Sequence, residues 1–103
     1  MMTPAIETTT FRAWLKGLRD RQAVARINTR IIRLRLGNPG DVASVGDGVS
    51  EMRLMFGPGY RVYFAMEADR LIILLAGGGK KTQANDIRTA KELWREWKEQ
   101  RDA

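Results

Sequence analysis

Residues 54–66, LMFGPGYRVYFAM, decide the fold, because an apolar run breaks at Gly-Pro-Gly and then resumes. On both sides of the break, every second residue is a large apolar one, as in half-buried strands: Met52, Leu54 and Phe56 before it, and Val62, Phe64 and Met66 after it. The pattern predicts a β-hairpin with strands over 50–56 and 60–66 and a loop of about three residues. The expected cross-strand pairs are Leu54 with Val62 on the core face and Arg53 with Tyr63 on the other, open face.

The segment 71–76, LIILLA, is apolar at every position, which predicts a central strand covered on both sides. A short turn precedes it, so it runs antiparallel to the second hairpin strand and its end near Ala76 returns beside Arg61. The following GGGKKTQ, residues 77–83, is therefore expected next to that arginine. Four cations then gather on the open face: Arg53, Arg61, Lys80 and Lys81.

Three helices are predicted around these strands. Thr10 is the expected N-cap of a helix over 11–19, after a short strand in AIETTT. A second helix, marked by an apolar stripe over 24–34, stops at Gly37, and a last helix begins at about Asn85. The second helix places three arginines together, away from its apolar stripe: Arg26, Arg30 and Arg33.

Length and composition predict a single domain over residues 1–103. No apolar run approaches the roughly 20 residues of a membrane span, and the first residues do not resemble a secretion signal, so a cytoplasmic location is expected. The chain has no cysteine and no histidine, which excludes a thiolate nucleophile, a cysteine-based zinc site and a histidine base. Any chemistry must use Lys, Arg, Tyr, Asp, Glu or the backbone.

The positive charge is concentrated in the helical part. The formal net charge is +6, and residues 11–37 alone carry eight basic side chains against one acidic, a net of +7. Residues 38–76 carry three basic and five acidic side chains, a net of −2. This favours a polyanionic partner, nucleic acid or an acidic protein, with a merely solvated basic face as the alternative.

The segment GGGKKT does not fit a nucleotide-binding P-loop. That motif needs a glycine five residues before Gly79, where Leu74 stands, and a serine or threonine after Lys80, where Lys81 stands. No Gly-x-Gly-x-x-Gly stretch is present either. No cofactor is therefore expected, and taken alone the glycines predict a flexible connection.

Several segments together resemble one family. FRAWLKGLRD, RLGNPGD, VGDGVSEMRLMFGPGYRVYF and ILLAGGGKKTQANDI, in this order and spacing, are similar to the HigB-like, addiction-module killer branch of the RelE/ParE toxin superfamily. The resemblance covers about residues 7–95. It implies a compact α+β fold, β-α-α-β-β-β-α, with two N-terminal helices on one face of a mainly antiparallel sheet and a C-terminal helix. Where the family pattern reads Gly-Gly-Asp-Lys-Ser, Lys80 replaces the acid.

The resemblance also implies a function. It indicates the toxin of a type II toxin-antitoxin module, a metal-independent endoribonuclease that cleaves messenger RNA in the ribosomal A site. The implied partners are the ribosome, messenger RNA and a cognate helix-turn-helix antitoxin similar to HigA. Two alternatives stay open: a ParE-like inhibitor of DNA gyrase, which would not need the four cations, and a catalytically degenerate binding module.

The resemblance assigns roles to the basic residues. Arg61 matches a phosphate contact, Arg53 the basic position on the preceding strand, and Lys80 or Lys81 the basic loop after the last strand. A lysine crowded by other cations is expected to release its proton readily and to act as the base. The predicted RNA-binding residues are Tyr63, Arg26, Arg30 and Arg33.

Two of these residues have a plain structural alternative. Arg53 is then an ion-pair partner of Glu51 or of a neighbour on the sheet. Tyr63 is then an ordinary cross-strand contact.

Overall fold

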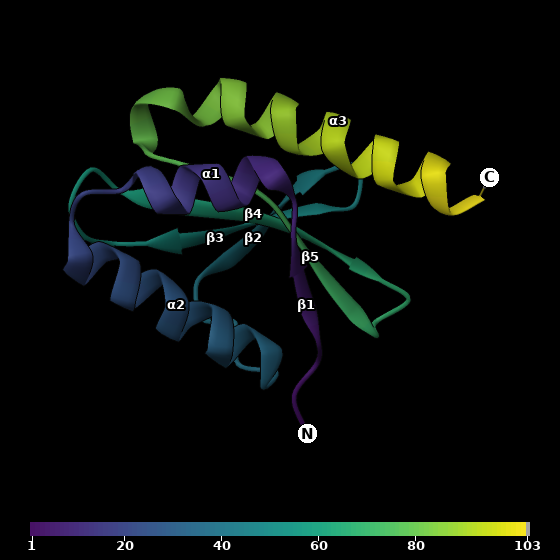
Figure 1. The fold of residues 1–103 in the computed structure, drawn as a ribbon, viewed down its shortest axis with the longest axis horizontal. Helices are drawn as coiled ribbons and strands as arrows, with labels where there is room; N and C mark the ends of the chain where they lie inside the picture. Colours follow the sequence, from purple (N-terminus) through teal and green to yellow (C-terminus); the bar gives the residue numbers. More distant parts are fainter. Residues whose placement is uncertain (103) are drawn as a thin grey trace.

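The computed structural model describes residues 1–102 as one five-stranded sheet with helices on both faces (Figure 1). The elements in chain order are β1 (Ala5–Glu7), α1 (Thr9–Gly17), α2 (Arg21–Arg35), β2 (Val42–Gly46), β3 (Val49–Leu54), β4 (Tyr60–Glu67), β5 (Leu71–Gly78), a short 3-10 turn (Lys80–Thr82) and α3 (Gln83–Asp102). The strand order is β1-β5-β4-β3-β2, with β1 parallel to β5 and the other pairs antiparallel. The expected α+β fold with a mainly antiparallel sheet is confirmed.

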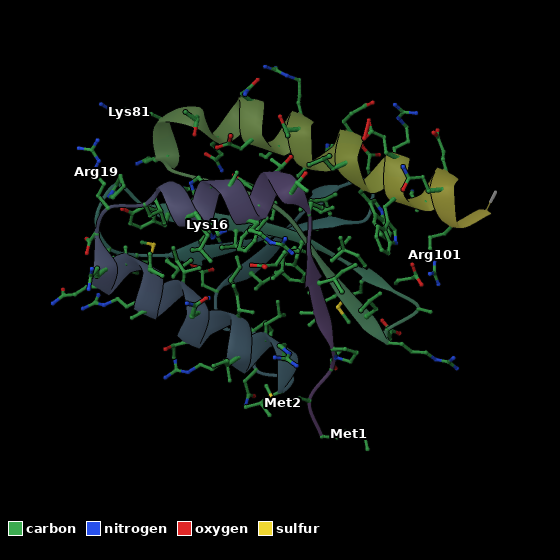
Figure 2. All side chains as sticks on the ribbon, in the orientation of Figure 1. Met1, Met2, Lys16, Arg19, Lys81 and Arg101 are labelled. Carbon is green, nitrogen blue, oxygen red and sulfur yellow. The ribbon has the colours of Figure 1, made fainter. Side chains whose placement is uncertain are left out.

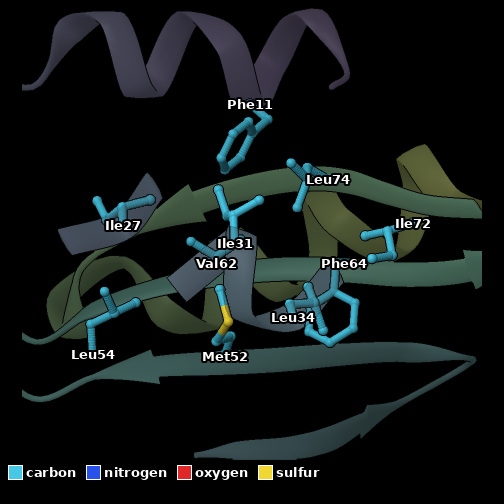
Figure 3. Packing of buried hydrophobic residues seen from close by; sticks show 10 residues of the cluster. All are labelled: Phe11, Ile27, Ile31, Leu34, Met52, Leu54, Val62, Phe64, Ile72 and Leu74. Carbon is cyan, nitrogen blue, oxygen red and sulfur yellow. The ribbon is translucent and has the colours of Figure 1, made fainter. Parts of the chain in front are cut away.

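Two helices cover one face of the sheet and one helix covers the other. Beneath α1 and α2, Phe11 and Ile27 pack with strand residues such as Val62 (Figure 3). Beneath α3, Trp94 packs in a second cluster that contains Leu75. Burial on both faces explains why β5 is apolar along its length. Among residues 1–102, no helix is long and apolar enough to cross a membrane.

The first helix begins earlier than predicted. Its N-cap is Thr8 rather than Thr10: the Thr8 Oγ1 accepts a hydrogen bond from the Phe11 backbone N–H at 3.0 Å and donates to the Leu75 carbonyl at 2.7 Å. Three successive threonines offer the same capping group, and the pairing of β1 with β5 selects the one that reaches Leu75. The second helix also begins earlier, because Asp20 caps it.

β2 is an edge strand that the sequence pattern did not reveal. It pairs antiparallel with β3, and Asp47 and Gly48 join the two strands. Asp47 and Gly48 have φ angles of 56° and 83°, as a tight Asp-Gly hairpin requires. The strand is short and only half-buried, so its residues carry little of the apolar alternation that marks β3 and β4.

The β3–β4 hairpin forms, but its register is shifted by two residues from the predicted one. Phe56 leaves the strand, and its ring packs 5.4 Å from that of Tyr60, so the loop comprises residues 55–59. Because the shift is even, each side chain keeps its predicted face. The predicted cross-strand pairs are replaced by Leu54 with Tyr60 and Arg53 with Arg61.

Candidate nucleic-acid interface

The surface beside the β3–β4 loop forms a hollow of about 390 Å³ that is lined by three of the four predicted cations. Arg53 and Arg61 reach it from opposite positions on β3 and β4. Gly78, at the end of β5, lies opposite Arg61, so the chain leaves the sheet beside that arginine and brings in Lys80. The predicted neighbourhood is confirmed for these three residues.

The two lysines of the 3-10 turn take different directions. The backbone N–H of Lys80 donates to the Pro58 carbonyl at 3.2 Å, which ties the turn to the β3–β4 loop, and the side chain lines the hollow. Lys81 does not line the hollow and lies at the outer edge of the molecule (Figure 2). Of the four predicted cations, Lys81 is therefore the one that is not part of the wall of the hollow.

Arg61 is largely buried, with 14% of its side chain exposed. Its Nε lies 3.4 Å from Oε2 of Glu51, and its Nη1 donates to the Gly59 carbonyl at 2.8 Å. Nε is itself buried and has no hydrogen-bond partner among the described residues. The guanidinium is thus held in place while it contributes to the wall of the hollow.

Glu51 is a buried carboxylate, 3% exposed, at the centre of a small network. Its Oε2 accepts hydrogen bonds from the Tyr63 hydroxyl at 3.0 Å and from the Gln83 side-chain amide at 2.8 Å. A buried carboxylate is unfavourable unless it is hydrogen-bonded and paired, and Arg61 supplies the opposite charge. The network joins β3 and β4 to the first residue of α3.

Tyr63 is fully buried beneath α3, in the cluster that contains Trp94. The prediction that it lies on an open face is wrong, because α3 covers this part of the sheet. Burial raises the pKa of Tyr63, and the hydrogen bond to Glu51 raises it further, so the phenol stays protonated at neutral pH. Stacking on an RNA base is not supported, and the structural alternative holds for this residue.

Arg53 forms an ion pair with Asp41, the residue before β2. Its Nη2 and Nε lie 2.7 and 3.2 Å from Oδ1 of Asp41, and this contact raises the pKa of Arg53. The alternative interpretation of Arg53 as an ion-pair partner is therefore confirmed, with Asp41 as the acid. Glu51, the other candidate acid, accepts hydrogen bonds from Tyr63 and Gln83 instead. Both side chains of the pair are well exposed, so water screens the attraction and Arg53 stays accessible to an anion.

A second groove, of about 340 Å³, lies between α2 and the β3–β4 loop. Arg30 is committed to the scaffold, because it donates to the carbonyls of Arg53 and Pro39 at 2.8 and 3.0 Å. Arg26 lies over the ring of Phe56, 4.7 Å from its centroid. The groove is lined by all three predicted arginines: Arg26, Arg30 and Arg33.

Comparison with known proteins identifies the family. Residues 13–95 match the family of phage-derived Gp49-like proteins (DUF891). The chain belongs to the Gp49-like family. An uncharacterized protein of Haemophilus influenzae is 51% identical over 96 residues, which are 92% of this chain and 97% of that relative.

In this Gp49-like chain, two glycines at the end of β5 are packing residues rather than a flexible connection. A Cβ on Gly77 would overlap the ring of Trp14 in α1, and one on Gly78 would overlap the carboxylate of Asp86 in α3. Their missing side chains allow both helices to approach the end of the sheet from opposite faces. This approach positions the turn that carries Lys80.

Two residues of the network around Arg61 were not predicted from the sequence as site residues: Glu51 and Gln83. A signal existed for Glu51: it lies on the same face of β3 as Arg53, and a buried arginine nearby needs an acid. Gln83 had no such signal, because it reaches Glu51 only through the docking of α3.

Proposed function

We propose that this Gp49-like protein is the toxin of a type II toxin-antitoxin module, of the HigB-like kind within the RelE/ParE superfamily. It acts in the cytoplasm as a metal-independent endoribonuclease that cleaves messenger RNA on the ribosome. A cognate helix-turn-helix antitoxin similar to HigA neutralises it. The observation that carries the proposal is the convergence of Arg53, Arg61 and Lys80 around one hollow.

The proposed reaction is attack of a ribose 2′-oxygen on the adjacent phosphorus. The 2′-hydroxyl loses its proton to a base, the bond from phosphorus to the 5′-oxygen breaks, and that oxygen gains a proton as it leaves. The products are a 2′,3′-cyclic phosphate and a 5′-hydroxyl. Cations held in advance around the phosphate stabilise the extra negative charge of the pentavalent transition state.

The geometry supports separate roles for the cations. Arg61 is the main phosphate contact, because the buried Glu51 holds it at the wall of the hollow. Arg53 assists from the opposite strand. Lys80 is favoured over Lys81 as the base, since Lys80 lines the hollow and Lys81 does not.

Dependence on the ribosome follows from the incompleteness of this site. The described residues that line the hollow include no histidine and no acidic side chain, so the RNA must be held in its reactive shape by something else. In the proposal, the second groove contributes Arg26 and Arg33 as additional contacts to the RNA backbone.

A reconstituted translation system with primer-extension mapping of the messenger tests the proposal, beside a gyrase supercoiling assay. The purified protein is expected to cut messenger RNA only when ribosomes are present. Arg61→Lys keeps a charge beside Glu51 but loses the planar guanidinium, and is expected to lose most activity. The matched control is Arg70→Lys, at the exposed turn between β4 and β5, which is expected to keep it.

Each alternative has its own outcome in these assays. Cutting of naked messenger RNA at the same rate contradicts ribosome dependence. Inhibition of supercoiling without cleavage indicates a ParE-like protein, and inactivity in both assays indicates a degenerate binding module. Co-expression of the protein encoded next to this gene is expected to relieve growth inhibition if that protein is the antitoxin.

A further inference from the structure

Three donors, two from β4 and one from α3, converge on one carboxylate oxygen, Oε2 of Glu51. The Gln83 amide of α3 lies 2.8 Å away, the Tyr63 hydroxyl of β4 lies 3.0 Å away, and Nε of Arg61 lies 3.4 Å away. The two uncharged donors make hydrogen bonds to this oxygen, whereas Nε of Arg61 has none in the described part of the chain. The charged donor is therefore attracted to the carboxylate without being bonded to it.

Such an arrangement is unusual for a purely structural ion pair. Buried polar groups in folded proteins are nearly always hydrogen-bonded, because an unpaired buried donor costs free energy. Here Tyr63 and Gln83 both donate hydrogen bonds to the carboxylate oxygen that lies 3.4 Å from Nε of Arg61. The carboxylate therefore holds the guanidinium in place by attraction, while no described residue uses the hydrogen-bonding capacity of Nε.

We propose that Glu51 is a positioning residue for the phosphate contact made by Arg61, and that Tyr63 and Gln83 hold Glu51 in place for this purpose. The inference rests on the proposed function, for which Arg61 is the main phosphate contact. Because Gln83 is the first residue of α3, the docking of that helix is coupled to the position of the guanidinium.

The chain offers a matched control for this network. Glu67, near the end of β4, also joins the sheet to α3: it accepts hydrogen bonds from Nε1 of Trp97 at 2.7 Å and from Arg101 at 3.0 Å. It does not line the hollow. Trp97 and Arg101 lie toward the C-terminal end of α3, whereas Gln83 is its first residue. Glu67→Gln is therefore expected to weaken contacts of the C-terminal part of α3 and to leave the contact between Gln83 and Glu51 in place.

Kinetics of ribosome-dependent cleavage separate positioning from stability. Glu51→Gln is expected to lower kcat by about tenfold or more, since misplacement of a reacting group by a fraction of an ångström is costly. KM is expected to stay the same or fall, because the loss of an acid makes the hollow more positive. Glu51→Asp keeps the charge but retracts the carboxylate, and is expected to share the loss in kcat. Glu67→Gln is expected to retain the wild-type kcat.

Side-chain NMR of the arginine Nε–H groups gives a readout that does not depend on RNA cleavage. In the wild type, the buried Nε–H of Arg61 is expected to exchange slowly with solvent and to shift on titration with inorganic phosphate. In Glu51→Gln the exchange is expected to be faster and the phosphate response weaker. Glu67→Gln is expected to match the wild type in both.

The outcomes distinguish this inference from the proposed function. If the wild type cleaves no RNA but the Arg61 signal and its phosphate response depend on Glu51, the proposed function fails and the positioning of an anion contact stands. If both Glu51 variants keep the wild-type kcat and Arg61 exchange, the inference is overturned and the function stands. Should Glu51→Gln not fold, Gln83→Ala replaces it. Gln83 is only half-buried, and its truncation removes one hydrogen-bond donor from the same oxygen of Glu51. Unchanged Arg61 exchange and kcat in that variant would equally overturn the inference.

Discussion

Removal of the Arg61 side chain is expected to destabilise the fold as well as to abolish activity. An arginine on an open sheet surface could be truncated with little effect on stability. In the structure, however, 14% of the side chain is exposed and its Nε lies 3.4 Å from Glu51, which is 3% exposed. Arg61→Ala therefore leaves a buried carboxylate without its cation.

The size of the effect follows from the pair's geometry. Two unit charges 3.4 Å apart attract by about 5 kcal/mol at an effective dielectric constant of about 20. Breaking a buried pair by removing one partner costs roughly 3–5 kcal/mol. Glu51 retains its hydrogen bonds from Tyr63 and Gln83, and Nε of Arg61 makes none within residues 1–102, so we expect a lower cost of about 2–3 kcal/mol. This is a large part of a small domain's stability.

Urea denaturation followed by tryptophan fluorescence measures the effect in Arg61→Ala, in Glu51→Gln and in the double variant. Because the double variant removes both charges, its free energy of unfolding is expected to exceed that predicted by adding the two single losses. Arg70→Ala, at an exposed turn, is the control for loss of an arginine. If Arg61→Ala were as stable as the wild type, or if the coupling fell below about 0.5 kcal/mol, the buried pair would be refuted.

The other variants test the core, the buried phenol and the two lysines. Leu54→Ala is expected to cost about 2–5 kcal/mol and to lose toxicity together with its urea midpoint, because Leu54 is 2% exposed in the main core. Tyr63→Phe is expected to cost about 1.5–3 kcal/mol through the lost hydrogen bond to Glu51. Burial raises the pKa of Tyr63 above its ordinary 10.0, so its contribution is complete below about pH 10 and is lost as the pH rises through the raised pKa. Melts across alkaline pH should therefore show a smaller decline for Tyr63→Phe than for the wild type. Lys80→Ala is expected to relieve growth inhibition more than Lys81→Ala, since Lys80 lines the hollow; equal effects would contradict its role as base.

Hydrophobic periodicity was sufficient to locate most elements and to assign their faces. The stripe of α2, the alternation in β3 and β4 and the continuous apolar run of β5 all report which side chains must leave water. The predicted face of each β3 and β4 side chain is correct although the predicted hairpin register is not, because a shift of two residues does not change the alternation. The antiparallel return of β5 also predicted that Lys80 would lie near Arg61.

The docking of α3 decided what the sequence could not reveal. The alternation of a strand is the same whether its second face meets water or a helix, so periodicity did not show that Tyr63 and Glu51 are buried. The contact that completes the network, from Gln83 to Glu51, joins residues 32 positions apart. Such a contact has no local signal, because it exists only after the helix has packed against the sheet. The sequence by itself therefore determined the basic residues and their strands, whereas only the tertiary structure decided which arginine is held by a buried acid and which lysine reaches the hollow.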